Sequence, residues 1–344
     1  MKNPKVTVLM PVYNGEKYLR GAMDSILSQS FTDFEFLIIN DGSIDNSKKI
    51  IDSYTDKRIR ALNNDKNIGL VNTLNRGIEL AQGEYIARMD CDDISLLNRL
   101  AVQVKFMEQH PTIGASGSFY NLLLNGKKAL VDFPLNKSEM KSFMIFNSPI
   151  AHPTVIIRKS ILQKEKLVYR SEYIHAEDYD LWSQISAVSD LANVSDVLLN
   201  YRVHENQITT NESLVLDKNE SLNSIRLRHL KLLDIIPSKD EMKIHHLVSD
   251  GRKAGSEEDV ANVELWLKKI HLENKKKNLF EDAYLGKIIL ERWLRMCFNY
   301  YGGRKGFQHF LNSELYVLIR LPLKQKFEFF KNLYNSYKRK KIKY

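Results

Sequence analysis

The N-terminal part of the chain alternates between short apolar runs and segments of helical period. The apolar runs have the length of strands and occupy residues 5–14, 34–41, 58–64 and 84–90. After each of the first three, apolar residues recur every three or four positions, over 15–30, 43–56 and 69–83. Short strands that alternate with helices in this way predict βαβ units and a mostly parallel, Rossmann-like α/β sheet with helices on both faces.

The pattern beyond about residue 215 is helical throughout. Three segments show this period, at 219–235, 261–274 and 280–302. Trp266, Leu290 and Trp293 fall at helical spacing within them, which favours a place in the core of a helical bundle over a role in stacking on a ligand. We therefore predict an α/β domain over residues 1–215 and a C-terminal helical region over 216–344.

The composition indicates a globular chain without a membrane span. Of the 344 residues, 43% are hydrophobic and 27% are charged, and no apolar run reaches the roughly 18 residues that a transmembrane helix requires. Pro11 and Asn14 interrupt the apolar N-terminus, so it is read as a first strand and not as a secretory signal. Two cysteines, Cys91 and Cys297, are too few for a disulfide framework and fit a reducing compartment, which predicts a cytoplasmic protein.

The positive charge is concentrated in the C-terminal tail. The net charge is +9, and residues 320–344 alone contain seven Lys and two Arg against one Glu. In a helix the aromatic residues of this tail would form one stripe with lysines beside it, namely Phe327, Phe330, Tyr334 and Tyr337 with Lys324, Lys331 and Lys338. Such a helix is typical of binding to an anionic membrane surface. The alternative is a helix docked on the protein, and no basic groove elsewhere suggests nucleic acid.

Polar residues follow each of the four predicted strands. They are Tyr13 and Asn14, then Asp41, Gly42 and Ser43, then Asn64 to Asn67, and finally Asp90, Asp92 and Asp93. Any one group could consist of turn and cap residues, and Asp93 could cap a helix that starts near Leu96. Because parallel strands bring these ends into one crevice, the four groups together favour a ligand site.

The last of these groups suits a divalent cation. Residues two apart on a strand point to the same side, so Asp90 and Asp92 can present carboxylates to one point while Cys91 faces away. Hard oxygen ligands favour Mg²⁺ or Mn²⁺, which commonly complete their coordination with substrate phosphates. The sequence therefore predicts a Mn²⁺ or Mg²⁺ site that holds a diphosphate.

An ordered series of motifs over about the first 205 residues resembles the inverting family 2 nucleotide-sugar glycosyltransferases of the GT-A fold, of the bacterial cell-surface polysaccharide type. It includes "VTVLMPVYNGEKYL", "FLIINDGSIDNS", "ARMDCDD", "AEDYDLW" and "YRVHENQIT". The resemblance implies a donor half at about 1–95 and an acceptor half at about 96–215. It also implies transfer from a UDP-sugar to a glycan or lipid-linked acceptor, at the inner face of the cell membrane, in the synthesis of capsule, O-antigen or exopolysaccharide.

The resemblance also implies roles for individual residues. Those that contact the nucleotide or diphosphate are Pro11, Val12, Tyr13, Asn14 and Asp41, with Asn67 and Arg88 as additions. Asp90 and Asp92 would coordinate the metal, and His204 lies where some relatives use a histidine near the metal and diphosphate. Cys91 departs from the family's usual small residue, such as alanine.

A catalytic base is expected where residues 177–185 begin a helix. Glu177, Asp178 and Asp180 stand in its first turn, where the helix dipole favours negative charge and where each could also act as a cap. The resemblance singles out Asp178 as the base that takes the proton of the acceptor hydroxyl, with no covalent enzyme intermediate. His152 could contact acceptor or metal, or it could be a hydrogen-bonded core residue.

Two other functions compete with this interpretation. Haloacid dehalogenase-like phosphatases also use a D-x-D motif, but normally on the first strand, whereas three βα units precede Asp90 here. A non-enzymatic protein could bind membrane or nucleic acid through the basic tail and leave the Asp cluster inert. A nucleotidyltransferase is disfavoured because "PVYNGEKYL" is not a glycine-rich, basic phosphate loop.

Overall fold

The computed structural model of the chain describes residues 3–124, 126–204, 215–327 and 329–330. The chain divides into two compact units. Met1–Lys137 and Ser148–Ser221 form the first, and Ser138–Asn147 and Leu222–Tyr344 form the second. The short segment Ser138–Asn147 therefore belongs to the second unit although the chain on either side of it belongs to the first.

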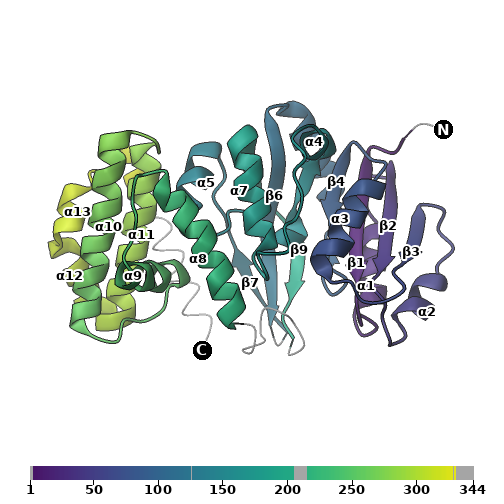
Figure 1. Cartoon of the computed structure of the whole chain (residues 1–344), viewed down its shortest axis with the longest axis horizontal. Coiled ribbons are helices and arrows are strands. Elements are labelled where there is room, and N and C mark those ends of the chain that lie inside the picture. The colour runs from purple at the N-terminus through teal and green to yellow at the C-terminus, as the bar shows by residue number, and fades with distance from the viewer. Residues whose placement is uncertain (1–2, 125, 205–214, 328, 331–344) are drawn as a thin grey trace. The chain divides into compact units, whose positions relative to one another are not determined.

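The first unit is built on a mixed, mostly parallel β-sheet (Figure 1). Its strands are β1 (Val6–Val12), β2 (Phe34–Asn40), β3 (Ile59–Asn63), β4 (Tyr85–Arg88), β5 (Ile94–Ser95), β6 (Ile113–Leu124), β7 (Lys127–Val131), β8 (Ile156–Arg158) and β9 (Asp190–Arg202). They lie in the order β3-β2-β1-β4-β8-β6-β9-β5, with β7 paired to β6. The first four strands are parallel, which confirms the predicted βα units, while β8 runs antiparallel to both β4 and β6.

Helices cover both faces of this sheet. They are α1 (Leu19–Leu27), α2 (Ser47–Asp52), α3 (Leu70–Leu80), α4 (Arg99–Gln109), α6 (Lys159–Lys164) and α7 (Glu177–Val188), with a 3₁₀ turn, η1 (His152–Thr154). Along β1, Val8 and Met10 share a core with residues of α1 and α4. Leu9 points to the opposite face and meets α3, where a Cβ on Gly77 would lie 2.3 Å from Leu9 Cδ1. Glycine thus allows α3 to approach the sheet closely.

The second unit is a bundle of helices (Figure 1). They are α5 (Lys137–Phe143), which begins one residue before the unit, α8 (Val215–Lys231), α9 (Lys239–Asp250), α10 (Glu257–Lys277), α11 (Asp282–Tyr301), α12 (Gly303–Asn312) and α13 (Glu314–Leu318). Trp266, Leu290 and Trp293 are buried in its hydrophobic core, so the predicted core role of these residues is confirmed. Ile145 and Phe146 from the inserted segment are fully buried in the same core.

The tail can be followed only in part. Phe329 is buried and Phe330 packs against the core of the second unit, whereas Phe327 is 71% exposed. At Phe330 the structure therefore shows docking on the protein, which was the alternative to a membrane-facing stripe. Tyr334, Tyr337 and most of the basic residues lie outside the described residues. Within the described part, no helix has the length and hydropathy needed to cross a membrane.

Candidate active site

The first strand ends in an exposed loop that is fixed to the loop after β2. Pro11 and Val12 are buried within β1, and Tyr13 is the first exposed residue, at 49%. Asn14 has a left-handed backbone, with φ of 50°, and its N–H donates to Ser43 Oγ at 3.0 Å. The residues that the resemblance assigns to the nucleotide therefore run from the sheet into a loop held in place by hydrogen bonds.

Asp41, directly after β2, organises the loop after β3. It is only 3% exposed, and its Oδ1 accepts hydrogen bonds from Asn64 Nδ2 at 2.6 Å and from the N–H of Ile68 at 2.9 Å. Its Oδ2 accepts from the N–H of Gly69 at 3.0 Å. A carboxylate has about four acceptor positions, so one remains on Oδ2 among the described contacts. Asn67 is exposed in the same loop, and its Oδ1 also accepts from Gly69.

The acidic cluster after β4 brings three carboxylates together. One oxygen of each of Asp90, Asp92 and Asp93 lies within 4.8 Å of the other two. Burial and the charge of Asp92 raise the pKa of Asp90, and burial with the charges of both neighbours raises the pKa of Asp93 well above its usual value. Cys91 packs against the core of the first unit, with Sγ 2.9 Å from where a Cβ on Gly15 would lie. Residues 89–93 lie beyond β4, which ends at Arg88, and Cys91 and Asp92 stand in a turn, so the strand alternation predicted for Asp90, Cys91 and Asp92 is not formed.

The expectation that Asp93 caps a helix near Leu96 is wrong. Asp93 is fully buried, and its Oδ1 accepts the backbone N–H of Arg202 on β9 at 3.0 Å. The short strand β5 follows it, so that α4 begins only at Arg99. Pairing with β9 therefore replaces the cap, and Asp93 Oδ2 has no hydrogen-bond partner among the described residues.

Two buried arginines lie close to the cluster. Arg88, 3% exposed, is bonded through Nη1 to Asp90, while its Nε has no partner among the described residues. Arg99 is fully buried and donates to the carbonyl oxygen of Arg88 at 2.7 Å and to Gln103 Oε1 at 3.1 Å. Burial and the charge of Arg88 lower the pKa of Arg99 to about 10. Their positive charges offset part of the repulsion among the carboxylates, and no sequence motif pointed to Arg99.

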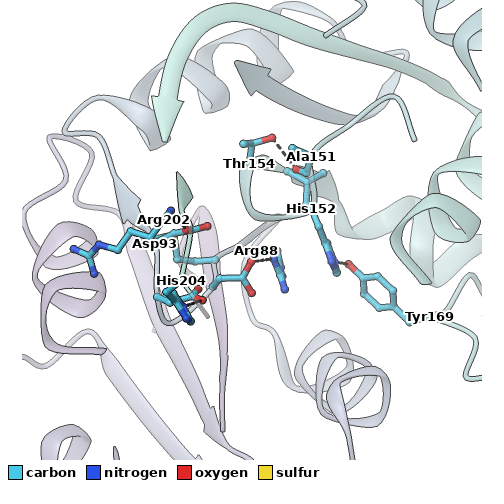
Figure 2. Close-up of polar contacts among 12 residues, drawn as sticks. Arg88, Asp93, Ala151, His152, Thr154, Tyr169, Arg202 and His204 are labelled. Atoms are coloured by element: carbon cyan, nitrogen blue, oxygen red, sulfur yellow. Dashed lines mark hydrogen bonds and ion pairs between the residues drawn. The ribbon is translucent and has the colours of Figure 1, made fainter. Parts of the chain in front are cut away.

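His204 joins the cluster from the end of β9. Its Nε2 lies 3.0 Å from Asp92 Oδ2, although the two residues are 112 positions apart in the sequence. Its ring packs on Tyr18, with the ring centres 4.7 Å apart. Figure 2 shows His204, Arg202 and Asp93 close together, with Arg88 next to them. Asp90, Asp92 and His204 are thus brought together as the sequence analysis expects.

This set of residues fits a hard divalent cation. Three carboxylates within one small region, with an imidazole bonded to one of them, supply the oxygen and nitrogen ligands that Mg²⁺ and Mn²⁺ accept. The buried Asp93 Oδ2 without a partner is an orphan acceptor of the kind that a cation or its water would satisfy. The residues present could therefore hold such an ion.

The predicted base stands at the N-terminus of α7. Glu177, Asp178 and Asp180 occupy its first turn, and Asp178 is partly exposed. Burial and the charge of Asp178 raise the pKa of Glu177 to about 7, against the opposing effect of Arg88. Burial raises the pKa of Tyr169, on which the charges of Arg88, Asp178 and Asp90 also act.

His152 is a half-buried, hydrogen-bonded residue. Its Nε2 lies 2.8 Å from the hydroxyl oxygen of Tyr169 (Figure 2). Burial and the charge of Arg88 lower the pKa of His152 well below its usual value, so the ring is neutral at neutral pH. The bond to Tyr169 is the kind of hydrogen bond that the core alternative for His152 predicts, although the residue is only half-buried. Tyr169 was missed by the sequence analysis, because it stands in no motif and at no predicted strand end.

Comparison with known proteins places the chain in a family. Residues 7–164 match the model of glycosyl transferase family 2. An uncharacterized glycosyltransferase of Haemophilus influenzae is 30% identical over 264 residues, which cover 71% of this chain and 81% of that protein. The chain belongs to glycosyl transferase family 2. It is therefore a glycosyltransferase, and the phosphatase and non-enzymatic alternatives are not supported.

Two further comparisons bear on fold and chemistry. The Escherichia coli UDP-Glc:alpha-D-GlcNAc-diphosphoundecaprenol beta-1,3-glucosyltransferase WfgD is 26% identical over 209 residues, 60% of this chain and 80% of that protein. The crystal structure of S. aureus TarS 1–349 in complex with UDP-GlcNAc aligns with a TM-score of 0.57 and 18% identity, over 85% of this chain and 87% of that one. The second likeness shows a shared fold, the GT-A architecture that the sequence resemblance implies.

Proposed function

We propose that this glycosyltransferase uses a divalent cation and transfers a sugar, with inversion, from a UDP-sugar to a glycan or lipid-linked acceptor in the synthesis of a cell-surface polysaccharide. The observation that carries the proposal is the convergence of Asp90, Asp92 and Asp93 at the carboxyl end of β4, with His204 bonded to Asp92. Neighbouring carboxylates repel each other and so reduce the stability of the fold unless a cation binds between them.

The nucleotide would lie over the ends of β1 and β2. Tyr13 is exposed there and can stack on a base, and Asn14 holds the loop that follows. The one acceptor position left on Asp41 Oδ2 suits the single N–H of a uracil ring, although Asp41 is almost buried. The exposed Asn67 belongs to the same loop as the donors that hold Asp41.

The diphosphate would lie at the acidic cluster. Asp90 and Asp92 would hold Mg²⁺ or Mn²⁺, with His204 beside Asp92, and the ion would neutralise charge on the departing nucleoside diphosphate. Arg88 is bonded to Asp90 and has an unused Nε, so it can orient Asp90 and add positive charge near the leaving group. These two carboxylates and one guanidinium would thus fix the donor's reacting end.

Asp178 would act as the general base. It takes the proton from an acceptor hydroxyl while that oxygen attacks the anomeric carbon from the side opposite the diphosphate, which inverts the configuration. The partly exposed position of Asp178 in the first turn of α7 leaves it open to a substrate. Glu177 beside it is buried, whereas Asp178 is partly exposed, which makes Asp178 the better candidate for a base that an acceptor can reach.

The relatives support the substrate classes. The name of WfgD specifies a UDP-glucose donor and a diphosphoundecaprenol-linked acceptor, and TarS has been crystallised with UDP-GlcNAc. A lipid-linked acceptor would require the enzyme to work at a membrane. We assign that contact, at the inner face of the cell membrane, to the basic tail beyond Leu321, whose lysines suit anionic lipids.

The donor assignment can be tested by thermal melting and product release. UDP with Mn²⁺ at about 100 times its dissociation constant should stabilise the protein by about 2.7 kcal/mol and raise the melting temperature by several degrees. GDP with Mn²⁺ is the matched control. A panel of UDP-sugars, assayed for UDP release with and without lipid-linked acceptor, identifies the donor. Equal stabilisation by GDP and UDP would remove the basis for a UDP-sugar.

The membrane assignment needs a separate test. The full chain should co-sediment with vesicles that contain anionic phosphatidylglycerol and not with pure phosphatidylcholine vesicles, and added salt should weaken this binding. A chain that ends at Arg320 should lose vesicle binding and keep UDP-sugar hydrolysis. Equal sedimentation of both chains would exclude the tail as the anchor.

A further inference from the structure

The segment that precedes α7 is fixed to α3 by a pair of hydrogen bonds between one side-chain amide and the backbone. Asn75 Nδ2 donates to the carbonyl oxygen of Tyr169 at 2.8 Å, and the N–H of Tyr169 donates to Asn75 Oδ1 at 3.0 Å. One side-chain amide thus satisfies both backbone groups of Tyr169, as a neighbouring strand would. The two residues are 94 positions apart, so this contact connects the predicted donor half of the domain to the acceptor half.

The side chain of Tyr169 adds a second connection. It is only 3% exposed, and its hydroxyl is bonded to His152 Nε2 at 2.8 Å (Figure 2). The His152 ring in turn meets Trp182 of α7 edge-on, with ring centres 6.0 Å apart. Tyr169 therefore connects α3, η1 and α7 through its backbone, its hydroxyl and its histidine partner.

The next residue ties the segment directly to the first turn of α7. Arg170 Nε donates to Asp180 Oδ2 at 2.7 Å, and its Nη2 is bonded to Oδ1 of the same carboxylate. Asp180 is fully buried and also accepts from Gln184 Nε2 at 2.7 Å. A bidentate hydrogen bond between a guanidinium and a carboxylate fixes the relative orientation of the two groups as well as their distance. The position of this turn is therefore coupled to Arg170.

We propose that Asn75, Tyr169 and Arg170 are positioning residues that hold the first turn of α7, and with it Asp178, at a fixed place relative to the acidic cluster. The inference rests on the proposed role of Asp178 as the base. Asp178 stands two residues before Asp180 in that turn, so a shift of the turn moves the base. Displacement of a reacting group by about 1 Å can cost about 100-fold in rate.

A merely structural role would predict something different. If these bonds only stabilised the fold, their loss would lower the melting temperature and affect donor binding and turnover alike. If they position α7, their loss should loosen its first turn and slow the reaction while the donor still binds. Exchange of backbone amides with deuterium measures the first effect directly and does not depend on activity.

The experiment uses the full chain with two variants and one matched control. Asn75→Ala removes both hydrogen bonds to Tyr169. Arg170→Lys keeps the positive charge but cannot form the bidentate bond to Asp180. Asn72→Ala is the control, because Asn72 lies on the same helix, is exposed, and in the described part of the chain donates to the carbonyl of Ile68 at 2.7 Å, just before that helix. Amide exchange over residues 177–182, the UDP-Mn²⁺ dissociation constant and the pH profile of UDP-sugar hydrolysis are measured for each protein.

For both variants we expect exchange over 177–182 to rise about fivefold or more and hydrolysis to fall about tenfold. The UDP-Mn²⁺ dissociation constant should stay within about twofold, and the pH midpoint of hydrolysis should move as the base changes its surroundings. The proposal is overturned if exchange is unchanged, if Asn72→Ala produces the same changes, or if donor affinity falls together with the rate. Asp178→Asn tests the base separately: unchanged hydrolysis in that variant refutes its role as base, while the exchange data still decide whether the segment holds α7.

Discussion

The acidic cluster of the first unit and the buried arginine of the second unit hold charge in opposite ways. In the first unit, Asp90, Asp92 and Asp93 lie together, and the pKa values of Asp90 and Asp93 are raised by burial and mutual repulsion. In the second unit, the fully buried Arg226 is paired with Asp250 at 3.0 Å. Like charges held together reduce stability until a cation binds, whereas opposite charges compensate each other. The contrast indicates a ligand site in the first region and a scaffold in the second.

The second unit also binds the segment Ser138–Asn147, which lies between two stretches of the first unit in the sequence. Arg226 Nε donates to the carbonyl oxygen of Phe146 at 2.8 Å, and His245 Nε2 is bonded to that of Ile145 at 3.0 Å. Trp266 Nε1 donates to His245 Nδ1, and because an indole N–H can only donate, the proton of this neutral histidine is on Nε2. The helices of the second unit thus satisfy the backbone of a segment that lies between β7 and η1.

The largest expected effect follows from removing this scaffold. A chain that ends at Ser221 leaves Ile145 and Phe146 without their core and two carbonyl groups without donors. Burying each of these side chains contributes about 1.5 to 3 kcal/mol, a large share of the roughly 5 to 15 kcal/mol by which a domain is stable. We expect the truncated chain to aggregate or to lose its cooperative melting transition, measured by calorimetry.

Co-expression provides the control for that truncation. Residues 222–344 supplied as a second chain should restore soluble, cooperatively melting protein if the lost contacts are the cause. A truncated chain that melts cooperatively near the parental temperature would contradict the scaffold role.

The second prediction compares the effects on UDP binding and on stability of one substitution in each region. Asp92→Asn should weaken Mn²⁺-dependent UDP binding by about 100-fold or more, because one of two hard ligands becomes neutral. Without metal its melting temperature should be unchanged or higher, because a like charge has been removed. Asp250→Asn should lower stability by about 1 to 3 kcal/mol, because the buried Arg226 loses its counter-charge.

Calorimetry for binding and urea unfolding for stability measure the two effects. The comparison fails if Asp92→Asn destabilises the metal-free protein as much as Asp250→Asn does. It also fails if Asp92→Asn binds UDP-Mn²⁺ with parental affinity.

The sequence predicted the regular part of the fold and the polar strand ends. The first four strands were found because their periodicity is local, and β2, for example, begins at Phe34 as the apolar run does. The place of Ser138–Asn147 in the second unit was not predicted, because its contacts join residues such as Phe146 and Arg226, 80 positions apart. No local pattern reports a contact of that kind.

The site was predictable where chemistry is concentrated in short motifs. The acidic cluster was predicted from its place after the fourth strand, although β4 ends at Arg88 and a turn, not strand alternation, brings its carboxylates together. His204 was assigned by resemblance. Arg99 and Tyr169 were missed, because the sequence does not distinguish an arginine or tyrosine that will be buried from one that will be exposed. Their partners are brought to them only by the fold. Asp93 was misread as a cap, because its real partner, Arg202, comes from a strand 109 positions away.

The third prediction concerns the pH dependence of stability in the first region. The pKa of Glu177 in the folded protein is about 7, above its usual 4.5. As the pH falls, the folded state therefore binds a proton at Glu177 at a higher pH than the unfolded state does. This stabilising contribution is complete below about pH 4.5 and is lost as the pH rises through about 7. Glu177→Gln should therefore be more stable than the parent by about 1 to 3 kcal/mol at pH 8, and by much less at pH 5.

Urea unfolding of both proteins at the two pH values measures this difference. Asp240→Asn, in which an exposed carboxylate of the second unit is changed, is the control and should follow the parent at both pH values. Parallel pH dependence of the parent and Glu177→Gln would show that Glu177 is not the group responsible.

The smallest expected effect is at Cys91, which stands between two metal-ligand candidates in the sequence and faces the core in the structure. Cys91→Ala should leave the UDP-Mn²⁺ dissociation constant within about twofold and cost about 1 kcal/mol of stability or less, because only one partly buried sulfur is lost. Gly15→Ala places a methyl group 2.9 Å from Cys91 Sγ and should destabilise the parent. The same substitution should cost less in the Cys91→Ala background, because the sulfur that it meets is gone. If Cys91→Ala instead lowered UDP-Mn²⁺ affinity as far as Asp92→Asn does, residue 91 would belong to the metal-binding face, and its contact with the core would not separate it from the site.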